Sequence, residues 1–232
     1  MSTAKSFDSD ELYDNCSSEP KELTCFCGKT AFTIFNGRVR KARECVCIDC
    51  YQHLTWANLK GGPEFPTIIP LSYWDNDVQI DRGEDDLMVV MLRESGRSRR
   101  LVAKCCYSML IIDHPSNKQF SFLLFENACK IHWVNQTDPP SVTGLFADRI
   151  FMSDWDDLRG ELLEFKGDPL RIDQGCCHPF TEKTNRQSID NLLGETCQSI
   201  FQRVSWYTLE MDESLIPKNK GNWPELKLIE PR

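Results

Sequence analysis

The chain has 232 residues and a net charge of −8, because 35 acidic residues outnumber 27 basic ones. An acidic balance of this kind argues against a protein built to bind nucleic acid, which usually shows a strong basic excess. The hydrophobic content of 41% can fill a core, and no stretch approaches the roughly 18 consecutive apolar residues that a membrane helix needs. We therefore expect a globular cytoplasmic protein that binds neither nucleic acid nor a membrane.

In chain order, residues 1–20 are rich in Ser, Asp and Glu and lack both an apolar period and a secretory signal, so they predict a flexible leader. Residues 21–140 are expected to form a β domain. Alternating apolar residues over 29–35, the Asn36-Gly37 turn signal and an extended run over 39–43 predict a β-hairpin that ends at Cys45. Further β-branched and aromatic runs predict strands at 86–92, 100–103, 108–112, 120–125 and 131–134.

Residues 141–232 differ in character and are expected to form a C-terminal extension with two helices packed on the β core. The first helix is predicted after Asp154 as N-cap, with Trp155, Leu158, Leu162 and Leu163 on one side. The second follows Ser188 as N-cap and carries apolar residues at helical spacing as far as Val204. The sequence thus indicates a mainly β fold with a helical extension.

Twelve cysteines are many for a chain of this size, and five of them fall in two short motifs. Cys25 and Cys27 form a C-x-C pair, and Cys45, Cys47 and Cys50 form C-x-C-x-x-C. Cysteines so close together rarely pair with one another in disulfides, but they readily surround one ion. Metal binding, with Zn²⁺ as the expected ion, is therefore favoured over the alternative of a secreted disulfide protein without its leader.

The first pair cannot close a four-ligand zinc site alone. Gly28 suits the tight turn that a metal knuckle requires, since glycine reaches positive φ without steric cost. Two more sulfur ligands must come from elsewhere in the chain, and Cys105 and Cys106, between two predicted strands, are the best-placed candidates.

The second motif predicts an open site, in which Cys45, Cys47 and Cys50 hold the ion and its fourth position accepts water or a thiol. Three thiolates give a zinc complex a net charge of −1, which favours exchange of a further thiolate over hydrolysis. An extended approach would place Lys41 and Arg43 on the side of Cys45, to hold a substrate carboxylate or to form only a solvated basic face.

Two further features near or beyond this motif have alternative interpretations. His53, three residues past the motif, could complete the site or transfer a proton, or could be an exposed residue without a special role. Cys176, Cys177 and His178 are more typical of an inert loop than of a nucleophile or ligand set, because adjacent cysteines do not easily bind one ion together.

The order of these motifs over residues 22–134 resembles the glutathione-dependent formaldehyde-activating enzyme family, which includes centromere protein V-like proteins. The resemblance implies an Mss4-like zinc-binding β fold. It implies one zinc held by Cys25, Cys27 and Cys106, and a second held by Cys45, Cys47 and Cys50 near a substrate thiol.

The late family motif, Phe-Cys-x-x-Cys-Gly-Ser, is only partly present here. Ala103 stands at the place of one ligand and Tyr107 at the place of a glycine. Either Cys105 replaces the missing ligand, or the first zinc has three protein ligands, or it is lost. The extension beyond residue 134 lies outside the family core and implies a lid, a dimer surface or a changed substrate. The second alternative would make the protein a homodimer.

These observations predict a zinc-dependent carbon–sulfur lyase or related thiol-adduct enzyme that acts on glutathione or a small sulfur metabolite. Cys45, Cys47, Cys50 and His53 are the candidate catalytic residues. The main alternative is a non-catalytic zinc module with a partner-binding surface. A redox switch that uses Cys105-Cys106 or Cys176-Cys177 is a third reading.

Overall fold

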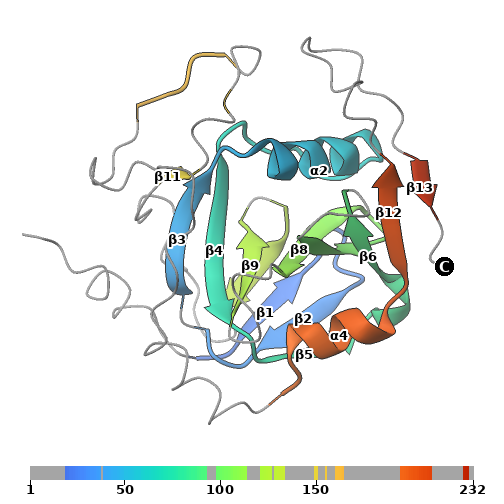
Figure 1. Ribbon diagram of the computed structural model, residues 1–232. Helices are drawn as coiled ribbons and strands as arrows, with labels where there is room; N and C mark the ends of the chain where they lie inside the picture. Colours follow the sequence, from blue (N-terminus) through green and yellow to red (C-terminus); the bar gives the residue numbers. More distant parts are fainter. Residues whose placement is uncertain are drawn as a thin grey trace, which may run out of the picture.

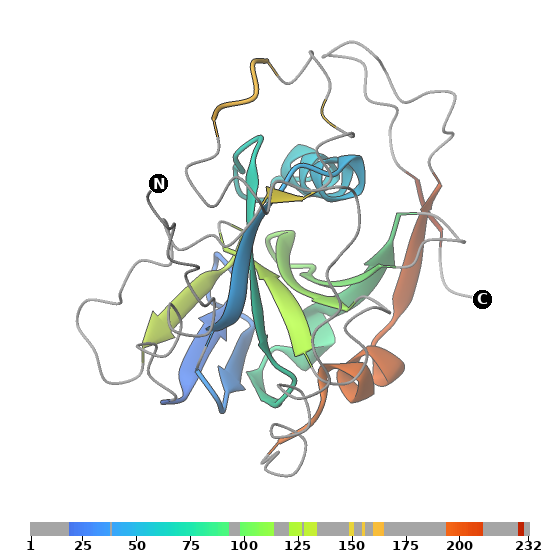
Figure 2. The same cartoon turned by 60° about the vertical axis from the view of Figure 1, so that its left-hand side comes forward.

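The structure, a computed structural model, describes residues 19–37, 39–92, 98–113, 121–126, 128–133, 149–150, 155, 160–164, 194–210 and 227–229. The fold is mainly β, as the sequence predicts, and its strands form two sheets. Figures 1 and 2 show a large curved sheet, with a small sheet at one side of it. No helix within the described part of the chain has the length and apolar character needed to cross a membrane.

The small sheet has four antiparallel strands in the order β10-β1-β2-β5. The large sheet has nine strands in the order β11-β3-β4-β9-β8-β7-β6-β12-β13. The pairs β11–β3 and β12–β6 are parallel, and the other pairs are antiparallel. The strands are β1 (Lys21–Thr24), β2 (Ala31–Ile34), β3 (Val39–Cys45), β4 (Ile69–Asp75), β5 (Val78–Arg82), β6 (Leu87–Met91), β7 (Arg99–Ala103), β8 (Ser108–Asp113), β9 (Ser121–Phe125), β10 (Lys130–Trp133), β11 (Arg149–Ile150), β12 (Trp206–Glu210) and β13 (Lys227–Ile229).

Two α-helices cover the large sheet from different sides. Helix α2 (Ile48–Leu59) lies across the end of the curved sheet, between β3 and β12 in Figure 1, and α4 (Cys197–Arg203) lies near β5. A short 3-10 helix, η1 (Glu84–Asp86), precedes β6. The N-terminus of α4 is capped by Thr196, whose side chain accepts a hydrogen bond from the Ser199 backbone N–H.

Both faces of the large sheet are buried, because each packs against a separate apolar core. Successive residues of β6 show the alternation: Leu87 and Val89 belong to the core shared with the small sheet and α4, whereas Met88 and Val90 belong to the core under α2. Strands buried on both faces read as continuous apolar runs, which is why β6 to β9 are predictable from sequence. The two cores also separate the cysteine motifs.

The predicted strands over 29–35, 86–92, 100–103, 108–112, 120–125 and 131–134 are confirmed within a few residues. The predicted hairpin is wrong, since β2 pairs with β1 and β5 whereas β3 pairs with β4 and β11 in the other sheet. The chain changes sheets at residues 35–37, where the Phe35 N–H donates to Asp77 O (3.2 Å) and Asn36 donates to the Asp75 carboxylate. These contacts direct the chain away from β2.

The described part of the extension differs from the prediction of two helices. Trp155 and residues 160–164 are not helical; Gly160 has a φ of +86°, outside the helical region, and its carbonyl accepts from Trp155 Nε1. The second helix is shorter than predicted and begins at Cys197, while Ser188 lies outside the described residues. The extension also supplies β11, β12 and β13 to the large sheet, which apolar periodicity did not indicate.

Candidate metal centres

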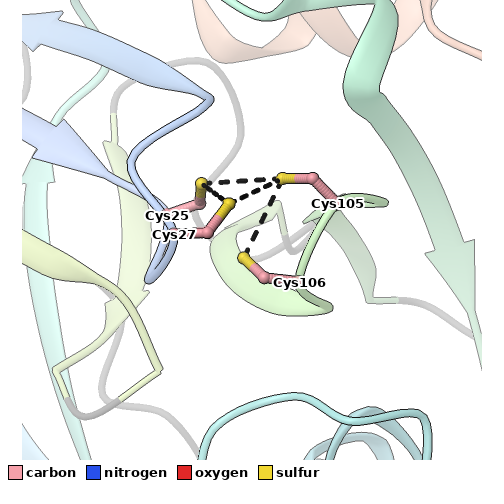
Figure 3. Close-up of side chains that lie close together, drawn as sticks. All are labelled: Cys25, Cys27, Cys105 and Cys106. Atoms are coloured by element: carbon pink, nitrogen blue, oxygen red, sulfur yellow. Dashed lines mark hydrogen bonds between the residues drawn. The ribbon is translucent and has the colours of Figure 1, made fainter.

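Four cysteines from two hairpin turns meet at one point, although they come from different sheets. Cys25 and Cys27 lie in the turn after β1, and Cys105 and Cys106 lie in the turn between β7 and β8. The Cys105 Sγ atom is 3.3 Å from Cys27 Sγ, 3.7 Å from Cys25 Sγ and 3.9 Å from Cys106 Sγ. Figure 3 shows the four side chains pointing toward one another. We call this group the four-cysteine cluster.

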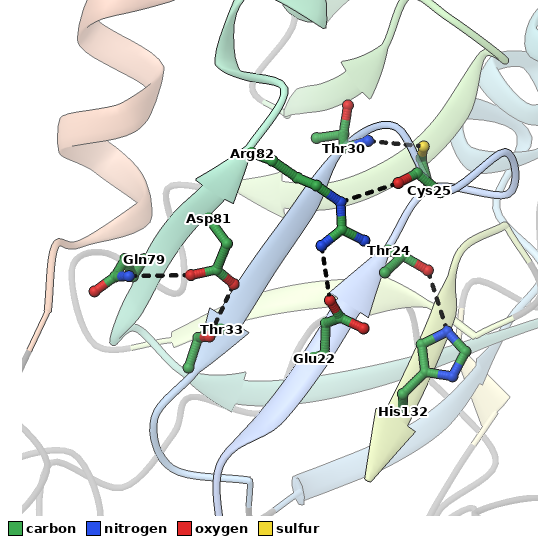
Figure 4. A network of polar contacts seen from close by, with 10 residues as sticks. Glu22, Thr24, Cys25, Thr30, Thr33, Gln79, Asp81, Arg82 and His132 are labelled. Carbon is green, nitrogen blue, oxygen red and sulfur yellow. Dashed lines mark hydrogen bonds and ion pairs between the residues drawn. The ribbon is translucent and has the colours of Figure 1, made fainter. Parts of the chain in front are cut away.

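The turn that carries Cys25 and Cys27 is held by backbone and side-chain contacts. Gly28 has a φ of +78°, as the sequence predicts for a knuckle glycine, and its N–H donates to Cys25 O (3.0 Å). The Thr30 N–H donates to Cys25 Sγ at 3.3 Å. Arg82 donates to Gly28 O (3.1 Å). Its guanidinium also pairs with Glu22 (3.0 Å), as Figure 4 shows. The sulfur positions are therefore fixed by the fold.

The turn between β7 and β8, which carries Cys105 and Cys106, contains a non-glycine residue with positive φ. Tyr107 has a φ of +50°, and it is the non-glycine residue with positive φ among the described residues. It stands where the motif of the resembled family has glycine, so this chain adopts a left-handed conformation there without a glycine. Ala103, at the place of a ligand, is buried at the end of β7, and Cys105 brings its sulfur to the cluster instead. This geometry matches the first of the three alternatives for the site.

Ser108 connects the two turns, since its hydroxyl accepts from the Phe26 N–H (2.9 Å) and lies 3.1 Å from Cys106 Sγ. Burial raises the pKa of the Cys106 thiol, but hydrogen bonds from Ser108 and from the backbone outweigh it and lower the pKa to about 7. Burial raises the pKa of Cys105. The cluster thus combines thiols of different acidity, as expected for neighbouring groups whose titrations are coupled.

The spacing of the four sulfurs fits a tetrahedral metal. Zinc–sulfur bonds of about 2.3 Å place the sulfurs of a zinc site about 3.8 Å apart. The four Sγ atoms all lie within 4.8 Å of one another, and small rotations of the side chains would bring them to that spacing. The cluster could hold a metal ion with four sulfur ligands and leave no position for a substrate.

The second motif forms a separate three-cysteine cluster of Cys45, Cys47 and Cys50. Cys45 ends β3, Cys47 is the N-cap of α2, and Cys50 lies in the first turn of that helix. The Cys47 sulfur accepts from the Cys50 N–H at 3.3 Å and lies 3.3 Å from Cys45 Sγ. A side-chain acceptor at the N-cap satisfies one of the free backbone N–H groups of the first helical turn. The local structure therefore gathers the three sulfurs.

All three side chains of this cluster are buried, and their Sγ atoms lie within 4.8 Å of one another. No fourth His, Cys, Asp or Glu from the described part of the chain joins the group. The cluster could hold a metal ion through three sulfurs. This is the arrangement that distinguishes it from the four-cysteine cluster.

A buried arginine lies beside the three-cysteine cluster. Arg100 is 2% exposed, and its NH2 group donates to Cys50 Sγ at 3.8 Å. Hydrogen bonds from Cys45 and Cys47, and then the positive charge of Arg100, keep the pKa of Cys50 well below its usual value. Hydrogen bonding to Cys47 and Cys50, with burial, raises the pKa of Cys45. Within the group, the thiol beside Arg100 is therefore the one whose pKa is shifted downward.

His53 is fully buried and lies behind the cluster, so the alternative of an exposed residue is wrong. Its Nδ1 is 2.9 Å from Asp49 O, and its Nε2 is 3.3 Å from Arg100 NH1. A carbonyl only accepts, so Nδ1 carries the proton and Nε2 accepts from the guanidinium. The ring is therefore neutral and oriented toward Arg100, and it does not join the sulfur group.

The two basic residues predicted for substrate binding lie on the same side of β3 as Cys45, since their register partners alternate along β4. Arg43 is buried, donates to the Tyr73 hydroxyl (3.4 Å) and lies over that ring, with 5.5 Å to the centroid. Lys41 is half-buried. The alternative of a solvated basic face therefore fails for Arg43.

Sequence reasoning did not single out Arg100, Gln52 or Trp56. Gln52 and Trp56 are each 1% exposed, lie one turn apart on α2, and have side-chain polar atoms without a hydrogen-bond partner in the structure. The Arg100 Nε atom is likewise without a partner. In the sequence, Gln52 and Arg100 are polar residues that adjoin apolar ones. An argument from apolar periodicity assigns such residues to the exposed side, so it does not identify them as buried.

Cys129 and Cys197, the other cysteines that the structure describes, join neither cluster. Cys129 and Cys197 are buried, and burial raises the pKa of each thiol. Cys197 lies in the apolar stripe of α4, as predicted. Cys176, Cys177 and His178 lie outside the described residues.

Comparisons with known proteins assign no function to these centres. No family model matches the chain, and no curated protein matches it. Among solved structures, the chain is similar to a crystal structure of a Rhodobacter sphaeroides protein, with 15% sequence identity and a TM-score of 0.34, over 51% of this chain and 91% of that chain. A similarity at this level carries no argument about fold or function.

Proposed function

We propose that the chain is a zinc-dependent carbon–sulfur lyase or related thiol-adduct enzyme with an Mss4-like β domain. The observation that carries this proposal is the difference between the two clusters: four sulfurs in one, and three buried sulfurs in the other. A structural zinc site is closed by four protein ligands, whereas a catalytic one keeps a position open. The family resemblance of the cysteine motifs supports the same division of roles.

In this proposal the four-cysteine cluster stabilises the fold. It joins the turn after β1 to the turn between β7 and β8, and so ties the small sheet to the large one. A metal bound there contributes folding free energy, since the unfolded chain holds no preformed site.

The three-cysteine cluster is the proposed reaction site. A zinc ion bound there would lower the pKa of an incoming thiol and fix its sulfur beside a carbonyl carbon or a leaving carbon. The protein residues supply the surroundings: the apolar core under α2 excludes water, and Arg43 and Lys41 lie on the side of the sheet that carries Cys45. Glutathione or a smaller sulfur metabolite, which brings both a thiol and a carboxylate, is the proposed substrate.

The test is metal analysis followed by cobalt substitution of the purified protein. We expect two metal ions per chain, and we expect added thiol to change the cobalt spectrum of one of them. A screen of thiol adducts then identifies the reaction. If two metals bind and neither responds to thiol, the chain is a non-catalytic zinc module, and the enzyme proposal is wrong.

A further inference from the structure

Arg100 is a buried cation whose compensating charge must be found nearby. Its side chain is 2% exposed, and no carboxylate from the described ranges forms an ion pair with it. Its contacts are Cys50 Sγ (3.8 Å), His53 Nε2 (3.3 Å) and Ser98 O (3.3 Å). A buried charge without a partner is strongly unfavourable. Of these three contacts, the imidazole and the carbonyl are neutral, so the sulfur cluster is the group that can carry the opposite charge.

His53 cannot supply the compensating negative charge, because an imidazole ring is either neutral or cationic. Asp49 O fixes the proton on Nδ1, and Nε2 faces a guanidinium donor, so a second proton on the ring would place two donors against each other. His53 thus orients Arg100 and remains neutral. The neighbouring Arg99 shows the usual solution on the opposite face of β7, where it pairs with the Asp113 carboxylate.

We infer that Arg100 is a positioning residue that balances the charge of the three-cysteine cluster and lets an anionic fourth ligand join it. This inference rests on the proposed function. A divalent ion with three thiolates carries −1, and Arg100 brings the local sum to zero. An incoming thiolate then gives −1 in a buried site. Without Arg100 the same step would leave −2 in the apolar core, which is far less favourable.

The role predicts a preference that depends on the charge of the ligand. A thiolate should need Arg100, whereas a neutral ligand such as imidazole should not, since it adds no charge to the site. A merely structural role for Arg100 would weaken both ligands together. The ratio of the two dissociation constants is therefore the informative measurement.

The experiment uses the full chain with cobalt in place of the native metal, titrated separately with 2-mercaptoethanol and with imidazole. We expect Arg100→Gln to weaken thiol binding by on the order of tenfold or more, with imidazole binding changed less than about threefold. Arg100→Lys keeps the charge and should keep most of the thiol affinity. Arg99→Gln, which removes a charge from the same strand on the opposite face, should leave both affinities unchanged.

Chelator competition separates the failure of this inference from that of the proposed function. If the wild-type cobalt protein ignores thiol, the enzyme proposal fails, and Arg100→Gln must still lower the metal affinity of the three-cysteine cluster for the charge assignment to stand. Equal loss of thiol and imidazole binding in Arg100→Gln overturns the inference, as does equal metal affinity in both proteins. If Arg100→Gln does not fold, a loss of thiol binding in Arg100→Lys as large as tenfold overturns it.

Discussion

The Sγ atoms of Cys27 and Cys105 lie 3.3 Å apart, although 78 positions separate the two residues in the chain. The contact joins a turn of the small sheet to a turn of the large one. Ala103 stands at a ligand position of the resembled motif, and the sulfur of Cys105, two positions further along, lies in the cluster instead.

Substitution of Cys105 should distinguish the two clusters by their metal content and by their response to thiol. We expect Cys105→Ser to lower the metal content from two ions to one and to reduce the free energy of unfolding, while the thiol response of the remaining cobalt persists. Cys45→Ser should do the reverse and abolish the thiol response. Metal analysis and absorption spectra of the cobalt proteins measure both effects. Two ions in Cys105→Ser would show that the four-cysteine cluster does not depend on this sulfur.

His53 is expected to support Arg100 and not to bind metal. His53→Ala removes one of the two acceptors of Arg100 NH1 and leaves Ser98 O, so we expect the free energy of unfolding to fall by about 1–3 kcal/mol. The ligand-field bands of bound cobalt should keep their positions. His132→Ala, at an exposed residue whose ring contacts Thr24 Oγ1 (3.2 Å), is the control and should change stability by less than about 1 kcal/mol. A shift of the cobalt bands in His53→Ala would instead identify a nitrogen ligand.

The Gln52 amide is buried without a hydrogen-bond partner, and a group in that state costs about 1–3 kcal/mol. Gln52→Leu fills a similar volume without polar atoms, so we expect the free energy of unfolding to be unchanged or higher. Chemical denaturation measures it, with Gln79→Leu at an exposed position as the control. A marked loss of stability in Gln52→Leu alone would show that the amide has a partner in solution.

Glu126 should make stability depend on pH. Burial raises the pKa of its carboxyl group, against opposing effects of a hydrogen bond with Ser72 and the charge of Lys21. The folded state thus binds the proton more tightly than the unfolded state. Stability from this group is complete below the unfolded pKa of about 4.3 and declines as pH rises through the folded pKa.

Relative to Glu126→Gln, the wild-type protein should therefore lose stability between about pH 4 and neutral pH. Urea denaturation of both proteins across that range gives the difference. A difference that grows in favour of the wild type as pH rises would contradict the assignment of a raised pKa.

The sequence allowed the strands with continuous apolar or alternating runs to be predicted, and it allowed the cysteines of both clusters to be grouped. Strands β6 to β9 contribute side chains to the apolar cores on both faces of the large sheet, so their sequences are continuous apolar runs that clearly indicate strands. The hairpin prediction failed because Asn36-Gly37 indicates a turn but not the sheet that the next strand joins. That choice depends on contacts with Asp75 and Asp77, which are distant in sequence.

Helix α2 and Arg100 could not be found in the same way. The buried side of α2 includes Gln52 and His53, and these polar residues weaken the apolar period by which a helix is recognised. Arg99 and Arg100 are adjacent basic residues, and only the pleat of β7 sends one to Asp113 and the other to Cys50. Local patterns therefore identified the sulfur ligands but not the groups that surround them.

The parallel pairings of β11 with β3 and of β12 with β6 have a consequence for the behaviour of the chain in solution. Without these pairings, β3 and β6 would be edge strands of the large sheet. Their unpaired backbone N–H and C=O groups could then pair with a strand of another molecule. We therefore expect the pairings of residues 149–150 and 206–208 to hinder association through these two edges. A shortened chain that keeps both cysteine clusters should self-associate unless these edges are covered in another way.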